Sequence, residues 1–412
     1  MLRITVIVGT LLTTCIVAVL MSIERQSAPH IQGYISVNKV LANDAHATEG
    51  FARATQVREF VFPDDHASHE EFKTEWWYFT GNLVTQSGRR FGYQLTFFRS
   101  ALKPRNIYDT VHARYYESWT SSQIYMAHCT VTDVQNNAFY CAERFSRSQK
   151  GLAGCLVVER AGKTKFRVWV ENWYGETDSS ARRGSIFPLR LEASIGDSVR
   201  LSFTLDSVKP TVLQGNSGLS QKSATPGNAS YYYSQSRMVT HGILTIRNES
   251  CEVHGLSWMD REWSTSALER HQVGWDWFAL HLDDGRDIMF YQLRARYPDG
   301  TIQPDTMSSG VIVYPDGTQK QIRYADAQLI PHGKWRSPVT GALYPKEWKL
   351  VLLQSDIQIT TTPLVANQEL DATVRYWEGA VRVHGWEHGR VLSGYGYVEM
   401  TGYADTQGQN MH

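Results

Sequence analysis

The amino-acid sequence predicts an all-β protein with two antiparallel β-barrels that follow an N-terminal hydrophobic segment. Short segments rich in aromatic and β-branched residues recur along the chain, bounded by Gly, Asn, Asp or Pro, and helical periodicity is weak. The 412 residues include 13 Trp and 21 Tyr, and such aromatics bury large areas in hydrophobic cores. One aromatic pattern also occurs twice, which indicates a repeated sheet module.

The chain begins with a segment that can target it to a membrane. No charged residue occurs from Ile4 to Ile23, and this length is just sufficient to span a bilayer as a helix. We therefore predict a signal or membrane anchor over residues 1–23 and a polar tether over 24–50. The rest of the chain is then expected in the periplasm, either anchored to the inner membrane or secreted by a signal sequence.

The remainder divides into two predicted domains, residues 51–229 and 230–412, with the boundary at the end of a Gly-, Ser- and Asn-rich loop. Seven or more short antiparallel strands in each half favour two barrels, or barrel-like sandwiches, over one open sheet. In the first half we expect a hairpin around Ser87-Gly88 and strands over 124–134, 138–145, 165–173, 189–193 and 199–205. In the second half we expect strands over 238–247, 256–263, 275–282, 287–296, 309–313, 347–353, 357–362, 376–383 and 394–399.

The repeated pattern links the two halves. Residues 76–79 (WWYF) and 93–95 (YQL) occur 198–199 residues before 275–278 (WDWF) and 291–293 (YQL). Two copies at this separation predict that each half contains one version of the same hairpin.

Charge and cysteine content narrow the classes of partner and site. Lys plus Arg equals Asp plus Glu at 41 each, so no electrostatic field favours nucleic acid. No Cys-x-x-Cys occurs, and we predict neither a metal site nor a cofactor. Cys129 and Cys141 flank an expected turn at 135–137, which leaves both a disulfide and two buried free thiols open.

The stretch from Gly255 to Trp277, GLSWMDREWSTSALERHQVGWDW, concentrates aromatic and charged residues. Strand alternation places Trp258, Asp260 and Glu262 on one face and Arg261 on the other. Burial beside an indole raises the pKa of a carboxyl group and a nearby Arg lowers it, so one acid could stay protonated beside an ionised neighbour. This arrangement suits general acid catalysis, and a salt bridge that closes one end of a barrel explains the same residues.

Several separated motifs resemble the AttH/CrtC family, which contains the carotenoid 1,2-hydratases and exported proteins described as secreted hydrolases. The resemblance rests on FPxDH at 62–66, EWWYFTGNL, YQLTFF, WMDREW, GWDWF, YWEG at 376–379 and GYGYVEMTGY at 394–403. These motifs follow one another in the same order over residues 51–405. The resemblance implies two lipocalin-like (calycin) barrels in tandem, which agrees with the internal repeat.

The resemblance also implies site residues. In the hydratase branch, an aspartate in an aromatic-x-Asp step protonates a carbon–carbon double bond, and a His-x-Trp step upstream assists it. Trp258 and Asp260 match the first step, with Trp in place of Tyr, while Tyr231 and Tyr233 stand where the His and Trp would be. The predicted catalytic residues are Asp260, Trp258, Tyr231 and Glu262, and the predicted ligand-binding residues are Tyr233, Trp275, Trp277, Tyr78, Tyr376 and Glu378.

Other polar residues have structural explanations. Arg261, Glu262 and Asp276 are expected to form one ion-pair cluster that orients the site. The acidic segment from His69 to Glu75 fits no metal motif and is expected to be a solvated entrance loop. A core tyrosine and an edge carboxylate explain Tyr376 and Glu378 as well as ligand binding does. Structural roles are also expected for four isolated histidines: His112, His128, His241 and His281.

The predicted function is that of an exported lipocalin-like protein that binds a hydrophobic isoprenoid or lipid-like molecule. It would act on this molecule as a hydratase or hydrolase with Asp260 as the general acid. The alternative is a non-catalytic periplasmic lipid carrier or chaperone that works with an inner-membrane transport system. The hydrolase class rests on the family alone, because no Gly-x-Ser-x-Gly nucleophile motif occurs.

Overall fold

The computed structural model of the chain describes residues 48–104, 122–266 and 268–404. Strands dominate these residues, and the named helices are three short 3-10 turns: η1 (Asp64–His66), η2 (Gln149–Gly151) and η3 (Tyr324–Asp326). The predicted all-β class is therefore confirmed. No helix within the described residues has the length and hydropathy needed to cross a membrane. The predicted segment 1–23 and nearly all of the tether lie outside these residues, so export and membrane attachment stay predictions.

Thirteen strands form the first antiparallel sheet, in the order β4-β3-β2-β1-β13-β12-β9-β8-β7-β6-β5, with β10 and β11 also paired to β12. The first six strands are β1 (Thr74–Val84), β2 (Arg90–Ala101), β3 (Gln123–Asp133), β4 (Ala138–Arg147), β5 (Ala153–Arg160) and β6 (Lys163–Val170). The others are β7 (Trp173–Thr177), β8 (Leu189–Ile195), β9 (Val199–Ser207), β10 (Val212–Leu213), β11 (Leu219–Gln221), β12 (Ala229–Ile246) and β13 (Glu249–Ser264).

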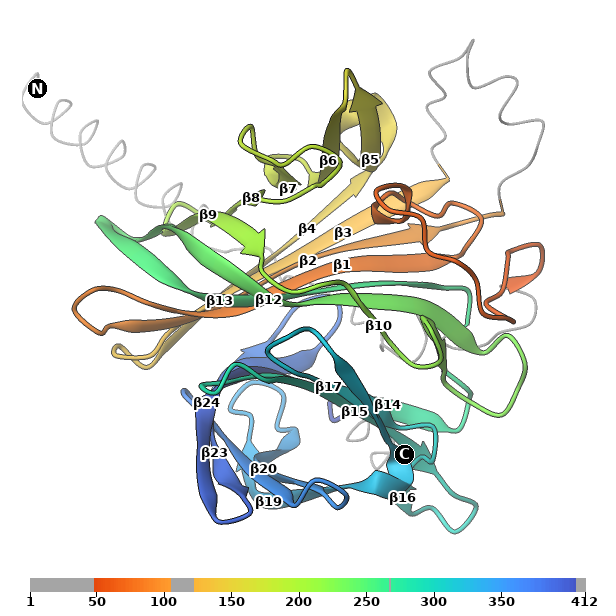
Figure 1. The fold of residues 1–412 in the computed structure, drawn as a ribbon, viewed down its shortest axis with the longest axis vertical. Helices are drawn as coiled ribbons and strands as arrows, with labels where there is room; N and C mark the ends of the chain where they lie inside the picture. Colours follow the sequence, from red (N-terminus) through yellow and green to blue (C-terminus); the bar gives the residue numbers. More distant parts are fainter. Residues whose placement is uncertain (1–47, 105–121, 267, 405–412) are drawn as a thin grey trace, which may run out of the picture. The chain divides into compact units, whose positions relative to one another are not determined.

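Eleven strands form the second antiparallel sheet, in the order β18-β17-β15-β14-β24-β23-β21-β20-β19, with β16 paired to β15 and β22 to β23. They are β14 (Gln272–Leu282), β15 (Asp287–Arg296), β16 (Ile302–Pro304), β17 (Ser309–Val313), β18 (Gln319–Arg323), β19 (Ala327–Arg336), β20 (Leu343–Leu352), β21 (Ile357–Pro363), β22 (Glu369–Leu370), β23 (Tyr376–Glu387) and β24 (Arg390–Thr401). Figure 1 shows this sheet curled so that β19 and β20 lie opposite β15 and β17.

The change of sheet falls between Ser264 and Gln272, not at the predicted boundary of 229/230. β12 begins at Ala229 and pairs with β13 on one side and β9 on the other. The long β12–β13 hairpin therefore completes the first sheet by joining β1 to β9. The Gly- and Ser-rich loop that suggested a boundary is a connection within one sheet.

The internal repeat corresponds to two hairpins. The first copy forms β1 and β2, and the second copy forms β14 and β15. Each hairpin is central in its own sheet, because β1 also pairs with β13 and β14 also pairs with β24. The two sheets are thus built around equivalent hairpins.

One face of each sheet packs in the core of that sheet, and the other face packs against the neighbouring sheet. Trp77 and Phe79 of β1 face the first core, and Phe278 and Leu280 of β14 face the second. A third cluster lies between the sheets and joins Tyr78 of β1 to residues of β12, β13, β14, β15, β17, β23 and β24. Packing on both faces explains why these strands are buried along almost their whole length.

Small side chains and one buried ion cluster hold the sheets together. A Cβ placed on Gly92 of β2 would lie 2.5 Å from the Cβ of Ala380 of β23, so only glycine permits this close approach. Asp287 of β15 binds Lys209 at 2.8 Å and Arg237 at 2.7 Å, and both cations come from the first sheet or its adjoining loop. This carboxylate is therefore an electrostatic link between the sheets.

The cysteines and the surface charge agree with the composition. Cys129 and Cys141 are free, because each pairs in register with the neighbour of the other and their side chains leave opposite faces of the sheet.

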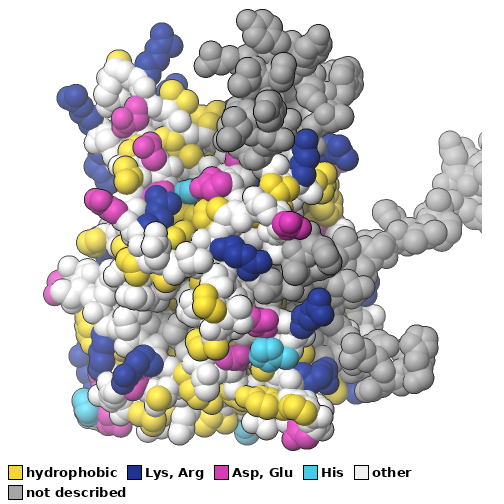
Figure 2. Space-filling view, turned by 90° about the vertical axis from the view of Figure 1, so that its right-hand side faces the viewer, with side chains coloured by type: hydrophobic (Ala, Val, Ile, Leu, Met, Phe, Trp, Pro, Cys, Tyr) yellow, Lys and Arg dark blue, Asp and Glu magenta, His cyan; other side chains and the backbone are white. Residues whose placement is uncertain are grey.

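On the face shown in Figure 2, acidic and basic side chains are interspersed with hydrophobic ones, and neither charge sign forms a patch. This mixture is what equal numbers of acidic and basic residues would give.

Candidate functional site

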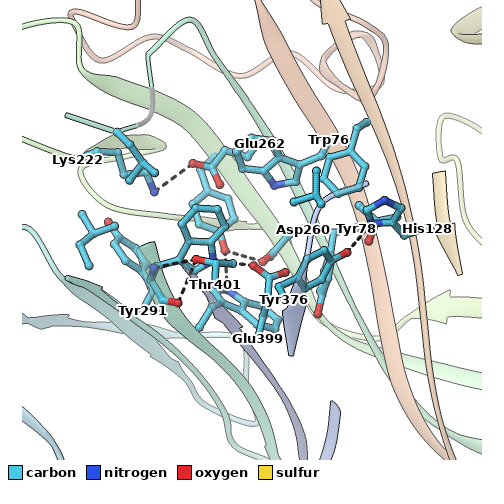
Figure 3. A pocket seen from close by; sticks show the side chains of 18 of the residues that line it. Trp76, Tyr78, His128, Lys222, Asp260, Glu262, Tyr291, Tyr376, Glu399 and Thr401 are labelled. Carbon is cyan, nitrogen blue, oxygen red and sulfur yellow. Dashed lines mark hydrogen bonds and ion pairs between the residues drawn. The ribbon is translucent and has the colours of Figure 1, made fainter. Parts of the chain in front are cut away.

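A cavity of about 150 Å3 lies between the two sheets. Side chains from both sheets line it, and most of the lining is aromatic or aliphatic (Figure 3). Equivalent positions of the internal repeat meet here: Trp76 and Tyr78 come from β1, and Trp275 and Trp277 come from β14. The predicted ligand-binding residues Tyr78, Trp275, Trp277 and Tyr376 all line this cavity.

The predicted alternation along β13 is confirmed. Asp260 and Glu262 line the cavity, while Met259 and Trp263 belong to clusters on the other face. In register, Asp260 lies between Tyr78 of β1 and Ser234 of β12. The sheet therefore presents Asp260 to the cavity from between two neighbouring strands.

Three neutral groups hold the Asp260 carboxyl. Trp258 donates from Nε1 to Oδ1 at 2.6 Å, Ser234 donates from its hydroxyl to the same oxygen, and Tyr232 donates from Oη to Oδ2 at 2.5 Å. Trp277 in turn donates from Nε1 to the Tyr232 hydroxyl at 3.2 Å. Trp258 thus binds Asp260 from the inter-sheet cluster and is not part of the cavity wall.

The environment of Asp260 favours a proton on its carboxyl group. Burial is the largest effect and raises the pKa of Asp260 to about 7, although the hydrogen bonds from Ser234, Tyr232 and Trp258 lower it. The charge of Glu262 raises it further. A carboxyl group with a pKa near neutrality can both hold and release a proton under physiological conditions, as a general acid must.

Glu262 occupies a different environment at the same face. Its carboxylate forms an ion pair with Lys222 at 3.1 Å and accepts a hydrogen bond from Ser230. The Lys222 ammonium also lies over the ring of Tyr291 at 4.3 Å, a cation–π contact. The two carboxylates of β13 are therefore distinct, since Asp260 has neutral partners and Glu262 has a cation.

The second sheet contributes a pair of carboxyl groups. Glu399 of β24 lines the cavity and accepts a hydrogen bond from Trp275 Nε1 at 2.6 Å. Its partner in register is Glu378 of β23, which is fully buried and accepts a hydrogen bond from the Tyr78 hydroxyl. Glu378 was predicted to contact ligand directly, but it lies behind Tyr78 and Glu399 and is not part of the cavity wall.

His128 of β3 and Tyr376 of β23 form a third polar group in the wall. His128 Nδ1 lies 2.6 Å from Tyr376 Oη, and its Nε2 lies 3.1 Å from a carboxylate oxygen of Glu143. His128 and Tyr376 both line the cavity, and the two ring nitrogens of His128 have partners, which is compatible with the structural role expected for this histidine. Of the other histidines, His281 is buried against the Ser236 carbonyl, His241 is exposed, and His112 lies outside the described residues.

The sequence placed Tyr231 and Tyr233 beside Asp260, and the structure shows both side chains elsewhere. Tyr232 faces Asp260, whereas Tyr231 and Tyr233 point to the opposite face of β12 and pack with Trp263. Tyr231 donates to the Gln56 carbonyl, and the Tyr233 hydroxyl contacts His66 Nδ1 at 2.5 Å. The cause is the period of a strand, because a shift of one residue moves every side chain to the other face.

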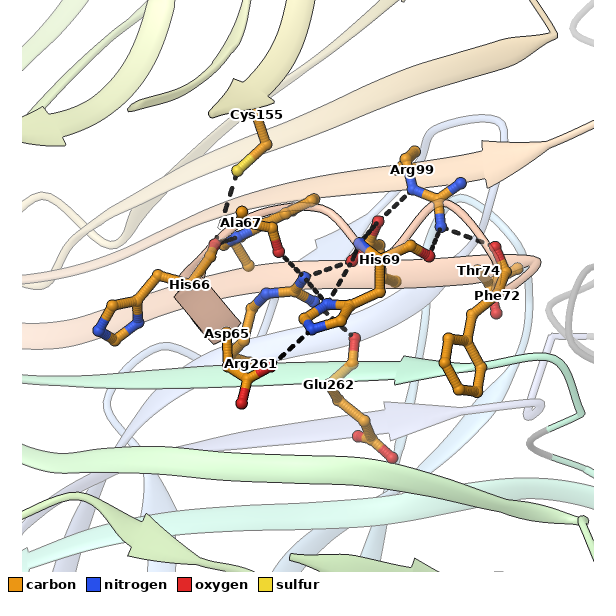
Figure 4. A network of polar contacts seen from close by, with 12 residues as sticks. Asp65, His66, Ala67, His69, Phe72, Thr74, Arg99, Cys155, Arg261 and Glu262 are labelled. Carbon is orange, nitrogen blue, oxygen red and sulfur yellow. Dashed lines mark hydrogen bonds and ion pairs between the residues drawn. The ribbon is translucent and has the colours of Figure 1, made fainter. Parts of the chain in front are cut away.

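A buried charged network lies on the other face of β13 (Figure 4). Glu75 of β1 is bound by Arg99 of β2, by Arg261 of β13 and by the backbone N–H of His69. Two predictions are corrected here. The segment from His69 to Glu75 is not a solvated loop at its ends, since His69 and Glu75 are buried.

The second correction concerns the expected ion-pair cluster of Arg261, Glu262 and Asp276. Arg261 binds Glu75, Glu262 binds Lys222, and Asp276 binds Arg294 at 3.1 Å. These are three separate pairs, because adjacent residues of β13 face opposite sides of the sheet. The described residues contain no group of three or more His, Cys, Asp or Glu side chains arranged to hold a metal ion.

We predict a pH-dependent stability difference between the wild-type protein and the Asp260→Asn variant. Since the folded-state pKa of Asp260 is raised to about 7, its stabilising contribution is present below pH ~4 and is lost as the pH rises through 7. The amide does not titrate, so the variant gains stability relative to wild type over this window, by roughly 4 kcal/mol at most. Urea unfolding at several pH values measures the difference, and a constant difference would show that Asp260 stays ionised.

Fold and cavity together define a two-sheet β protein with an aromatic, carboxyl-bearing site between its sheets. The chain belongs to the AttH-like family, whose profile matches residues 53–403. A protein of Nitrosomonas europaea assigned to AttH has a similar crystal structure, with a TM-score of 0.70 and 29% identity over 86% of this chain and 100% of that one.

The chain is also similar to two hydratases, to one in sequence and to the other in structure. Over 147 residues the chain is 24% identical to kievitone hydratase of Fusarium solani subsp. phaseoli, which covers 35% of this chain and 40% of that enzyme. The match thus spans less than half of the length of this curated relative. The crystal structure of kievitone hydratase from Nectria haematococca has a TM-score of 0.60 at 17% identity, over 87% of this chain and 98% of that one, and this supports the fold.

Proposed function

We propose that the protein adds water to a carbon–carbon double bond in a small branched apolar group, such as the end of an isoprenoid chain. The observation that carries this proposal is the setting of Asp260. Its carboxyl lies at the wall of an aromatic cavity, and its hydrogen-bond partners are the neutral groups of Ser234, Tyr232 and Trp258. A structural salt bridge would instead place a cation beside it.

The proposed reaction uses groups that line the cavity. Asp260 delivers its proton to the less substituted alkene carbon, which breaks the π bond and leaves a cation on the branched carbon. The faces of Trp275, Trp277 and Tyr78 surround the space and can stabilise this cation. Water then forms the new C–O bond and loses a proton, which gives a tertiary alcohol.

The size of the cavity limits what it can hold. An apolar cavity of about 150 Å3 accommodates one molecule of roughly the size of benzene. This space suits a single branched five- or six-carbon group and not a whole lipid, so the rest of a larger substrate would extend beyond it. The similarity to an enzyme named as a hydratase supports the reaction class.

Incubation of the purified protein with kievitone and with short isoprenoid alkenes tests the proposal. We expect a product heavier by one water, detected by liquid chromatography with mass spectrometry, and its amount should scale with enzyme and time. Stoichiometric retention of unchanged alkene, seen by native mass spectrometry, would contradict the enzyme and favour the non-catalytic carrier. The saturated analogue of each alkene is the control, because it has nearly the same size and shape and cannot be hydrated.

A further inference from the structure

Hydration of an alkene also needs a group that takes a proton from the attacking water. The carboxyl pair of the second sheet lies where such a group is needed. Glu399 and Glu378 are direct cross-strand partners on β24 and β23, and Glu399 lines the cavity together with Asp260 of β13. In Figure 3, Asp260 and Glu399 enter the same part of the cavity from the two different sheets. The site therefore contains two proton-carrying groups that face one space.

We propose that Glu399 is the base that takes the proton from the attacking water, and that Glu378 positions it by sharing one proton with it. This inference rests on the proposed hydration and assigns its second proton transfer. Trp275 Nε1 and Glu378 hold the Glu399 carboxylate from the protein side. A carboxylate oxygen has two lone pairs, so Glu399 can still accept a proton from a water in the cavity.

The pair carries a single proton for an electrostatic reason. Two adjacent buried carboxyl groups cannot both ionise, because like charges at this separation repel strongly in a medium of low polarity. Burial and the charge of Glu399 raise the pKa of Glu378 well above its ordinary value, and Glu378 donates to Glu399. Burial raises the pKa of Glu399 to about 7, while the hydrogen bonds from Trp275 and Glu378 lower it.

The other titratable groups around Glu399 are compatible with a single proton on the Glu378–Glu399 pair. The charges of Asp260 and Glu262 raise the pKa of Glu399, and the surrounding phenols have pKa values raised well above their usual range and stay neutral. Lys222 is paired with Glu262, and His128 faces Tyr376 and Glu143. The phenols are those of Tyr78 on β1, Tyr376 on β23 and Tyr397 on β24.

The protons balance over one turnover. Asp260 loses its proton to carbon, and the water that forms the C–O bond loses one to the Glu399 carboxylate. Both carboxyl groups return to their starting protonation states when Glu399 releases that proton to solvent and Asp260 takes one up. The net reaction is alkene plus water to alcohol, with no oxidant or other reactant.

The test is the pH dependence of turnover in the Glu399→Gln variant. For wild type we expect a bell-shaped kcat profile, because Glu399 must be ionised and Asp260 protonated. Glu399→Gln should lower kcat by about 100-fold to 10,000-fold and remove the acidic limb of the profile. Glu378→Leu should move the acidic limb to higher pH, because Glu399 loses a hydrogen-bond donor while remaining in place.

Glu369→Gln is the matched control. Glu369 is a buried carboxylate of the second sheet that accepts hydrogen bonds from Ser337, Thr340 and Tyr344 and does not line the cavity. Its substitution should leave the shape of the profile unchanged. An unaltered acidic limb in Glu399→Gln, with turnover present, overturns the role of Glu399 alone. Absence of turnover in wild type overturns the proposed hydration itself and the base with it.

Discussion

Replacement of Asp260 by Asn is expected to lower turnover by about 100-fold to 10,000-fold while the protein stays folded, because the amide has no proton to give to carbon. The amide can keep the observed hydrogen bonds. Its oxygen can accept from Trp258 and Ser234, and its nitrogen can donate to the Tyr232 hydroxyl. Turnover and thermal unfolding measured on the same preparation test this expectation. A large loss of stability near pH 5 would contradict it, since a structural ion pair would then be broken.

Two tyrosines provide a matched control for the site. Tyr232→Phe removes the hydrogen bond to Asp260 Oδ2 and should also reduce turnover. Tyr231→Phe is the same change one residue earlier, on the opposite face of β12, and should leave turnover unchanged. Equal effects of the two substitutions would place the reaction elsewhere.

The largest expected effect on stability comes from Asp287→Ala. This fully buried carboxylate binds Lys209 and Arg237 and also accepts a hydrogen bond from Ser236 at 3.1 Å. Its removal leaves two cations without this partner at the junction of the sheets. The free energy of unfolding should fall by about 3–5 kcal/mol, as is typical when one partner of a buried pair is lost. Urea unfolding at neutral pH measures this change.

Asp284→Ala is the control for the ion cluster. Asp284 also binds an arginine, Arg286, but Arg286 keeps a second carboxylate partner in Glu387. The loss should therefore be about 1 kcal/mol or less, as for partly exposed pairs. A loss of the same size for Asp284→Ala and Asp287→Ala would mean that Asp287 does not link the sheets in the way that its contacts indicate.

Much of the fold could be predicted because central strands carry a strong local signal. The aromatic and β-branched runs of β1, β2, β14 and β15 are buried on both faces, so their composition alone identifies them. Strands such as β5 and β19 were not predicted. They lie at the ends of the sheets and at least half of their residues are exposed, so their sequences lack a clear apolar pattern.

The sequence also predicted part of the site. The alternation along β13 placed Asp260 and Glu262 on one face, since this depends only on the geometry of a strand. The residues of β12 beside Asp260 were instead expected from a match to the family motif at Tyr231 and Tyr233, whereas the register places Tyr232 on the face of Asp260. A two-residue turn joins β12 to β13, but a bulge between Gln235 and Met238 shifts the register before it reaches Asp260, and the spacing of the sequence does not reveal that bulge.

The remaining site residues needed the three-dimensional fold. Lys222 lies in a loop without periodicity, and His128 comes from a strand of the first sheet that meets β23 of the second. Glu399 lies within the motif GYGYVEMTGY, which indicated the family but did not indicate a role for this residue. Its partnership with Glu378 appears only in the β23–β24 register.

The most direct test of the central claim is a reaction of a branched alkene with the protein in deuterium oxide. If Asp260 protonates the double bond, the recovered tertiary alcohol should carry one deuterium on the carbon adjacent to the one that bears the new hydroxyl group, as observed by NMR. The Asp260→Asn variant should give almost no labelled alcohol under the same conditions. Recovery of the unlabelled alkene alone from wild type, bound in the cavity but unchanged, would contradict the claim.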